Sequence, residues 1–130
     1  MLIKKLAEEY ATAWRKAIVD GDVAFFEKLF DPGFVLHGMG MRDISLEAYM
    51  KHEIEMHERA RTIGWDIKYI TGDRYLFALE FNGHFLFTSD LPGRPGMAGK
   101  EFNSHALCLF RVKNGKIIEE WSNTTVTGLT

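Results

Sequence analysis

The sequence predicts an α+β fold in which helices come first and an antiparallel sheet follows. In residues 2–20, apolar side chains recur at helical spacing, with Lys, Glu and Arg between them. From Trp65 onward, the apolar side chains alternate with a period of two, which is typical of strands. Helices and strands do not alternate along the chain, which argues against a parallel sheet built from strand–helix–strand units.

The composition indicates one folded domain over residues 1–130. The chain has 130 residues, 46% of them hydrophobic, and can bury a core without disulfides. Its net charge of −2 argues against nucleic acid and membrane surfaces as partners, because both select a basic face. No apolar run is long enough to cross a membrane, and the first residues lack the pattern of a signal peptide. The single cysteine, Cys108, fits a reducing compartment, so we expect a cytoplasmic protein.

Three helices and one short strand are expected in the first half of the chain. The first helix covers residues 2–20, and the second covers residues 23–30 after Asp22, which can cap it. A turn leads into a short strand at residues 34–37. Ser45 is a plausible N-cap for a third helix, which is expected to run to about residue 62 and to close at a glycine.

The second half is expected to form a meander of strands. Expected strands cover residues 65–71, 74–81, 101–112 and 116–126. The Asn82-Gly83 pair leaves two alternatives, a hairpin turn or a bulge within one long strand that reaches residue 88. The face on which His84 lies depends on this choice.

The closing hairpin carries a family resemblance. Its residues Phe110-Arg111-Val112, Gly115-Lys116-Ile117, Glu119 and Trp121 resemble the last hairpin of the SnoaL-like branch of the NTF2-like superfamily. The resemblance also includes Asp31-Pro32, His37-Gly38, Gly72-Asp73-Arg74, Gly99-Lys100 and Gly128-Leu129. It implies a cystatin-like cone, in which a curved antiparallel sheet wraps on the helices around a pocket. It also implies a dimer more often than a monomer, and the family includes polyketide cyclases, isomerase-like enzymes and many proteins with no known activity.

The sequence departs from this family at one functional position. In the cyclases, an Asp four residues after the Trp is the general acid/base, and the matching residue here is Thr125. A hydroxyl group has no pKa near neutrality and cannot abstract the proton in its place. The resemblance therefore leaves open whether this protein is an enzyme.

The turn at Asn114-Gly115 predicts the register of the closing hairpin. A two-residue turn places Lys113 opposite Lys116. The pairs that follow are Phe110 with Glu119, Cys108 with Trp121, Ala106 with Asn123, and Ser104 with Thr125. Because the resemblance implies an inward Trp121, this set is expected to line the cone. A one-residue bulge would invert the assignment beyond it.

Seven residues are candidates for the site. We expect His37 to transfer protons and Asn123 to hold an oxyanion, if the protein is catalytic. The expected ligand-binding residues are Trp14, Tyr49, Phe110, Trp121 and Thr125. Each of these aromatic residues could equally be plain core, His37 a strand histidine bonded to the backbone, and Asn123 and Thr125 strand-end polar groups.

Neither a metal nor a cofactor is expected. His52 and His57 are five residues apart and point in different directions around a helix, whereas a zinc helix needs a spacing of four. No glycine loop with a following Lys-Ser/Thr is present to hold a phosphate.

Three functions remain open, all with a small apolar ligand or a protein partner. They are an isomerase, lyase or cyclase that acts beside a carbonyl, a non-catalytic binding protein, and a dimeric interaction module. We expect a homodimer that buries Leu107, Leu109 and Ile118 on the outer sheet face, because soluble proteins rarely expose such a strip.

Overall fold

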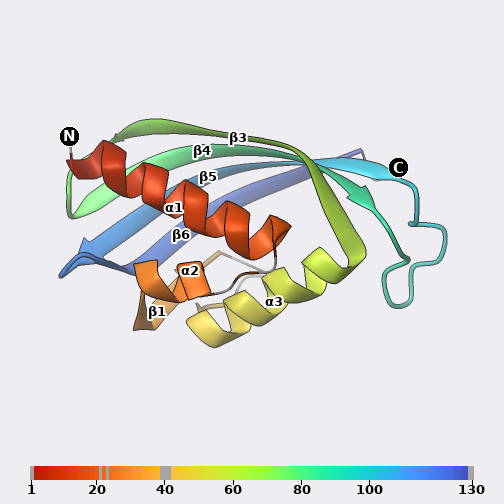
Figure 1. The fold of residues 1–130 in the computed structure, drawn as a ribbon, viewed down its shortest axis with the longest axis horizontal. Helices are drawn as coiled ribbons and strands as arrows, with labels where there is room; N and C mark the ends of the chain where they lie inside the picture. The colour runs from red at the N-terminus through yellow and green to blue at the C-terminus, as the bar shows by residue number, and fades with distance from the viewer. Residues whose placement is uncertain (1, 21, 23, 39–41, 129–130) are drawn as a thin grey trace.

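The computed structural model describes residues 2–20, 22, 24–38 and 42–128 (Figure 1). In this part of the chain helices and strands follow the expected order, except for one additional two-residue strand, Ile44–Ser45, before the third helix. The helices are α1 (Leu2–Val19), α2 (Ala24–Leu29) and α3 (Leu46–Arg59). The strands are β1 (Phe30–His37), β2 (Ile44–Ser45), β3 (Ala60–Gly72), β4 (Leu76–Phe87), β5 (Glu101–Lys113) and β6 (Lys116–Thr127). None of the described helices is long and apolar enough to cross a membrane.

The strands form one curved sheet in the order β2-β1-β6-β5-β4-β3, and the helices cover one face of it (Figure 1). This arrangement confirms the α+β cone. The sheet is mixed and not wholly antiparallel, because β1 pairs in parallel with β6. The parallel pair arises because α3 and the meander separate β1 from β6 in the sequence, so that β6 returns beside β1 at the end of the chain.

Local capping signals are confirmed at the helix starts. Oγ of Ser45 accepts a hydrogen bond of 3.2 Å from the backbone N–H of Ala48, which caps α3. Oδ1 of Asp22 accepts one of 3.1 Å from the N–H of Ala24 at the start of α2. The predicted end of α3 is wrong by about one turn, since the helix ends at Arg59 and Gly64 lies inside β3. Pairing of Ala60 with Phe87 on β4 draws this segment into the sheet.

The Asn82-Gly83 pair is neither a turn nor a bulge of its own strand. β4 runs through it, and its pairing with β5 continues without a shift. The register shifts of this hairpin lie in β3, between Thr62 and Gly64 and between Tyr69 and Thr71. Position 83 lies on the inner face and has no room for a larger residue, because a Cβ there would lie 2.5 Å from the Phe85 ring and 2.7 Å from the Phe81 ring. Strand alternation then puts His84 on the outer face.

The predicted register of the closing hairpin is correct at the turn and wrong beyond it. Lys113 pairs with Lys116 and Val112 with Ile117, but Arg111 pairs with Glu119, so Ile118 is an extra residue in β6. This bulge shifts every later pair by one position, which places Cys108 opposite Ser122 and Leu109 opposite Trp121. The inward set of β6 is therefore Glu120, Ser122, Thr124 and Val126 in place of Trp121, Asn123 and Thr125.

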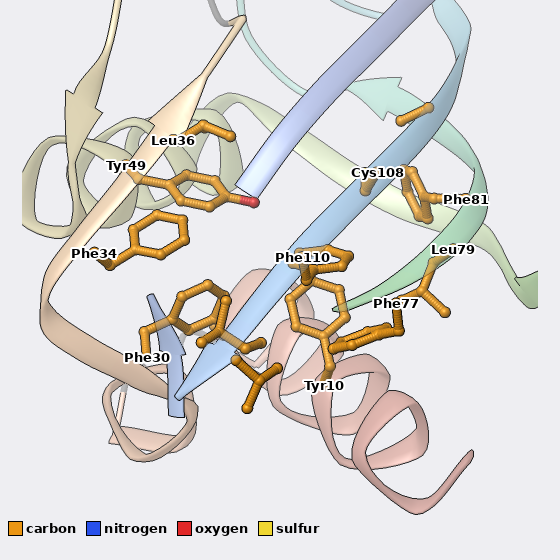
Figure 2. Close-up of a cluster of buried hydrophobic side chains, with 14 residues drawn as sticks. Tyr10, Phe30, Phe34, Leu36, Tyr49, Phe77, Leu79, Phe81, Cys108 and Phe110 are labelled. Atoms are coloured by element: carbon orange, nitrogen blue, oxygen red, sulfur yellow. The ribbon is translucent and has the colours of Figure 1, made fainter. Parts of the chain in front are cut away.

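The main core lies between the inner sheet face and the helices. Figure 2 shows aromatic side chains from α1, α3 and three strands meeting there, with Tyr10 and Tyr49 reaching in from the two helices. The rings of Tyr10 and Phe110 lie 4.5 Å apart, and those of Phe30 and Phe34 lie 4.6 Å apart. A second apolar cluster at the other end of the sheet contains Ala60, Phe87, Met97 and Phe102. Residues of both clusters line a common cavity.

Candidate functional site

A cavity of about 340 Å³ lies on the inner side of the sheet, beside α3. Its size is at the lower end of the range that small-molecule sites occupy. Apolar residues form most of the wall, including Leu36, Met56, Ala60, Phe81, Phe85, Phe102, Ala106 and Val126. Its polar residues are Tyr49, His52, Glu53, His57, Ser104, Cys108, Glu120, Ser122 and Thr124. Among the described residues that line this cavity there is no Lys or Arg.

Glu120 is the most unusual group in this wall. Glu120 is only 2% exposed. Its side chain faces inward because the bulge at Ile118 shifts the alternation of β6 by one residue. Among the described residues, its Oε1 is a buried polar atom with no hydrogen-bond partner. Burial, reinforced by the charge of Glu53, raises the pKa of Glu120 to about 8. A hydrogen bond from the Cys108 thiol opposes this rise. Glu120 therefore carries a proton over much of the neutral range.

Two buried tyrosines and one thiol surround Glu120. Burial and the charge of Glu120 raise the pKa of Tyr10 and of Tyr49 well above their usual value. Burial also raises the pKa of Cys108 to about 12. All three groups stay protonated near neutral pH, so they act as hydrogen-bond donors and Cys108 is not a thiolate nucleophile.

Helix α3 contributes a second carboxyl group to the cavity. Glu53 is half-buried, and burial raises its pKa to about 7. His52, the preceding residue, has a lowered pKa, chiefly because of burial, although Glu55 opposes the effect. The neutral form of His52 is therefore favoured.

The predicted catalytic histidine lies on the other side of the sheet. His37 bonds to Oδ1 of Asp43 through Nδ1 and to Oε2 of Glu119 through Nε2, both at 2.8 Å. Both hydrogen bonds raise the pKa of His37, and the bond to Asp43 has the larger effect. Its ring stacks on Trp121 at 5.0 Å, and the Arg111 guanidinium lies 5.7 Å from the Trp121 ring. A network of charged and aromatic groups thus covers this part of the outer face.

The structure divides the candidate residues between the two faces. Tyr49 lines the cavity, whereas Phe110 is fully buried in the core and does not reach it. His37, Trp121 and Asn123 share a shallow groove of about 380 Å³ on the outer face. Thr125 is exposed and lines a separate hollow. The side chain of Trp14 lies outside the described residues.

Glu120 and Glu53 were missed as candidates. Glu120 follows Glu119 directly, and without the bulge the alternation puts Glu119 inside and Glu120 outside. Glu53 lies in a polar helix segment with His52 and His57, where a solvated face is the usual interpretation. The one available signal was that Glu53 follows Tyr49 by four residues, which places both on the same helix face.

The geometry offers no evident metal centre. In the described part of the chain, no three or more His, Cys, Asp or Glu side chains come together in a way that could hold an ion.

Comparison with known proteins agrees with the fold. Among curated proteins no match was found. AclR from Streptomyces galilaeus, a proposed hydroxylase, has a TM-score of 0.74 at 19% identity over 94% of this chain and 87% of that chain. IdmH from Streptomyces antibioticus, a proposed polyketide cyclase, has a TM-score of 0.72 at 18% identity over 92% and 91%. An NTF2-like protein from Anabaena variabilis has a TM-score of 0.70 at 15% identity over 95% and 90%.

At such low identities these likenesses establish the NTF2-like fold alone. A family model shows the family as well, because it matches almost the whole chain. The model of the SnoaL-like polyketide cyclases matches residues 5–129, and the chain therefore belongs to this family of small-molecule pocket proteins.

Proposed function

We propose that the protein is an enzyme that binds a small, mostly apolar carbonyl compound in the cavity and transfers protons beside its carbonyl group. One observation carries the proposal. Oε1 of Glu120 is buried on the wall of the cavity without a hydrogen-bond partner among the described residues. A buried polar atom left unpaired destabilises a fold by about 1–3 kcal/mol. A ligand that supplies the missing partner would recover that energy on binding.

The protonation state of Glu120 suits this chemistry. A group with a pKa near the working pH exchanges protons most effectively, and the pKa of Glu120 is about 8. As a carboxylic acid, Glu120 would donate its proton to the carbonyl oxygen of the ligand, and as a carboxylate it would take that proton back. The hydroxyl of Tyr49, which lines the same cavity, would stabilise negative charge on that oxygen as a second donor. Closing a polyketide ring beside a carbonyl needs the same enol chemistry, so the family match supports the proposal.

The wall of the cavity also suggests the charge of the ligand. Phe81, Phe85 and Phe102 supply aromatic surface, and the described lining residues include two carboxyl groups but no Lys or Arg. A ligand with a carboxylate or phosphate group inside the cavity would face these two carboxyl groups without a Lys or Arg among the described lining residues to pair with it. We therefore propose an uncharged carbonyl compound.

Hydrogen exchange tests this proposal with simple ketones in place of the natural substrate. A panel of cyclic ketones that includes 2-tetralone is incubated in D₂O, and proton NMR follows the loss of the hydrogens beside the carbonyl. We expect the wild-type protein to accelerate the exchange and Glu120→Gln to lower the acceleration about 100-fold or more, the usual contribution of a positioned acid/base. Glu8→Gln, at an exposed carboxyl of α1, serves as the control and should leave the rate unchanged.

Two other results would contradict the proposal in different ways. Ketone binding without any acceleration would favour a non-catalytic binding protein. Acceleration that survives Glu120→Gln would remove Glu120 from the chemistry. A catalytic role for His37 with Asn123 stays a prediction, and the site in question would be the groove on the outer face. Loss of hydrogen exchange in His37→Gln would favour that role.

We also propose that the protein is a homodimer that buries the outer sheet face. Leu107 and Leu109 are 47% and 37% exposed there, beside the groove that Trp121 lines. Such a strip of aliphatic side chains is typical of an interface. In sedimentation experiments at about 10–100 μM protein, a range that detects micromolar association, the wild type should sediment as a dimer and Leu109→Glu as a monomer. A monomeric wild type would refute the interface. A cytoplasmic location stays a prediction that depends on the single cysteine.

A further inference from the structure

The cavity contains a second carboxyl group that the proposed function leaves unused. Glu53 lies on α3 one turn after Tyr49, and its side chain lines the same cavity as Glu120. Glu120 comes from β6, in the sheet on which the helices pack, so the two carboxyl groups approach the cavity from different elements. A ligand between α3 and the sheet would therefore lie within reach of both groups.

The surroundings of this pair do not compensate two negative charges. The titratable groups that face Glu120 are Tyr10 on α1, Tyr49 and Glu53 on α3, and Cys108 on β5. Those that share the cavity with Glu53 also include the imidazoles of His52 and His57 on its own helix. The tyrosines and the thiol are neutral near pH 7, and burial favours the neutral form of His52. Two carboxylates facing one cavity with so little compensation ionise one after the other and hold a single proton between them.

We propose that Glu53 is the second catalytic residue of the cavity, the base that works with Glu120 as the acid. The inference rests on the proposed function, since it assigns the partner that proton transfer beside a carbonyl needs. Glu53 is half-buried and Glu120 almost completely buried. The carboxyl group with more access to water loses its proton first, because water stabilises its charge. The single proton of the pair therefore stays mainly on Glu120.

The proton transfer is balanced within this pair. The Glu53 carboxylate removes a proton from the carbon beside the carbonyl, while the Glu120 carboxylic acid gives its proton to the carbonyl oxygen. The electron pair of the broken C–H bond forms the C=C bond of an enol, and the C=O π electrons take up the proton from Glu120. The pair begins with one proton and ends with one proton, now on Glu53. The reverse steps regenerate the ketone and restore Glu120.

The pH dependence of ketone exchange tests this assignment. Because only the singly protonated pair is active, the rate with 2-tetralone should follow a bell-shaped curve whose limbs belong to the pair. In Glu53→Gln the rate should fall about 100-fold or more, and the acidic limb should disappear because no base remains to be protonated. Glu53→Asp keeps the carboxyl group and should recover part of the rate with both limbs. Retention of the full rate and of the acidic limb in Glu53→Gln would overturn the assignment.

A titration without substrate separates this inference from the proposed function. Carbon NMR of protein labelled at the glutamate carboxyl carbons reports the ionisation of Glu120 directly. We expect Glu120 to ionise at lower pH in Glu53→Gln than in the wild type, because the neighbouring charge is gone, and to be unmoved in the control Glu8→Gln. An unchanged Glu120 titration would overturn the pair even if the protein accelerates exchange. A shifted titration together with exchange lost only in Glu120→Gln would leave the proposed function standing and refute Glu53 as the base.

Discussion

Replacing Glu120 by Gln should stabilise the protein at high pH. In the folded protein, burial raises the pKa of Glu120 from 4.5 to about 8. Between these values the folded state holds a proton that the unfolded state has lost. The contribution of Glu120 to the free energy of unfolding is therefore complete below the lower pKa, declines as the pH rises above it, and is fully lost once the pH has risen through the higher pKa. Gln has a similar shape and no charge to bury, so Glu120→Gln should lack this decline.

The size of the effect follows from the shift. A change from 4.5 to about 8 is about 3.5 units, and at about 1.4 kcal/mol per unit this corresponds to about 5 kcal/mol. Because the residue is only 2% exposed, solvent screening in the folded state is small. Water that enters the cavity when Glu120 ionises would lower the penalty, so we expect about 2–5 kcal/mol. This is a large part of the total stability of a domain of this size.

Urea unfolding at two pH values measures this effect. The three tryptophans supply the fluorescence signal, and linear extrapolation supplies the free energy of unfolding. Between about pH 5 and about pH 9 the wild type should lose more stability than Glu120→Gln by the amount above. Glu8→Gln, whose carboxyl group is exposed, should lose as much as the wild type. Equal losses in the wild type and Glu120→Gln would refute a buried, protonated Glu120 and would weaken the proposed chemistry with it.

Three further changes test the surroundings of the site. The raised pKa of His37 means that its bonds to Asp43 and Glu119 stabilise the fold below about pH 6.5 and weaken as the pH rises through the folded-state pKa. His37→Gln should therefore lose less stability than the wild type over the same urea series, and an equal loss would argue against this ion cluster. Gly38 has a φ of 100°, and a Cβ there would lie 2.5 Å from the carbonyl oxygen of Ser122, so Gly38→Ala should destabilise by about 1–3 kcal/mol in thermal unfolding. Gly93→Ala, with a φ of 72° and nothing within 4 Å, tests the backbone strain alone and should be milder. Ser45→Ala removes the cap of α3 and should lower the free energy of unfolding by about 1 kcal/mol, whereas no change would show that the hydrogen bond to Ala48 contributes little.

Much of the fold could be predicted from local signals. The helix starts at Asp22 and Ser45 follow from side chains that accept backbone hydrogen bonds. The turn at Asn114-Gly115 follows from residues that adopt positive φ, and both do so here, at 52° and 76°. Each of these signals depends on only a few neighbouring residues, so it could be recognised before any packing was known.

The site could not be predicted in the same way. Ile117 and Ile118 are both apolar, so the sequence does not reveal which of them continues the alternation and which is the extra residue of the bulge. Packing decides this, since Ile117 is completely buried in the core while Arg111 pairs with Glu119 on the outer face. The position of the bulge has a large effect because one added residue moves every later side chain of β6 to the opposite face of the sheet. It exchanges Trp121 for Glu120 in the cavity.

The sequence by itself determined most of the elements, the fold class and the family, because periodicity, caps and turns act over a few residues and the family motifs are short. The tertiary structure alone decided which side chains meet. Glu53 and Glu120 are distant in the sequence, and they share a cavity only because α3 packs against the inner face of the sheet. Their pKa values depend on the burial that this packing creates. Burial is a property of the assembled fold, and no local pattern in the chain records it.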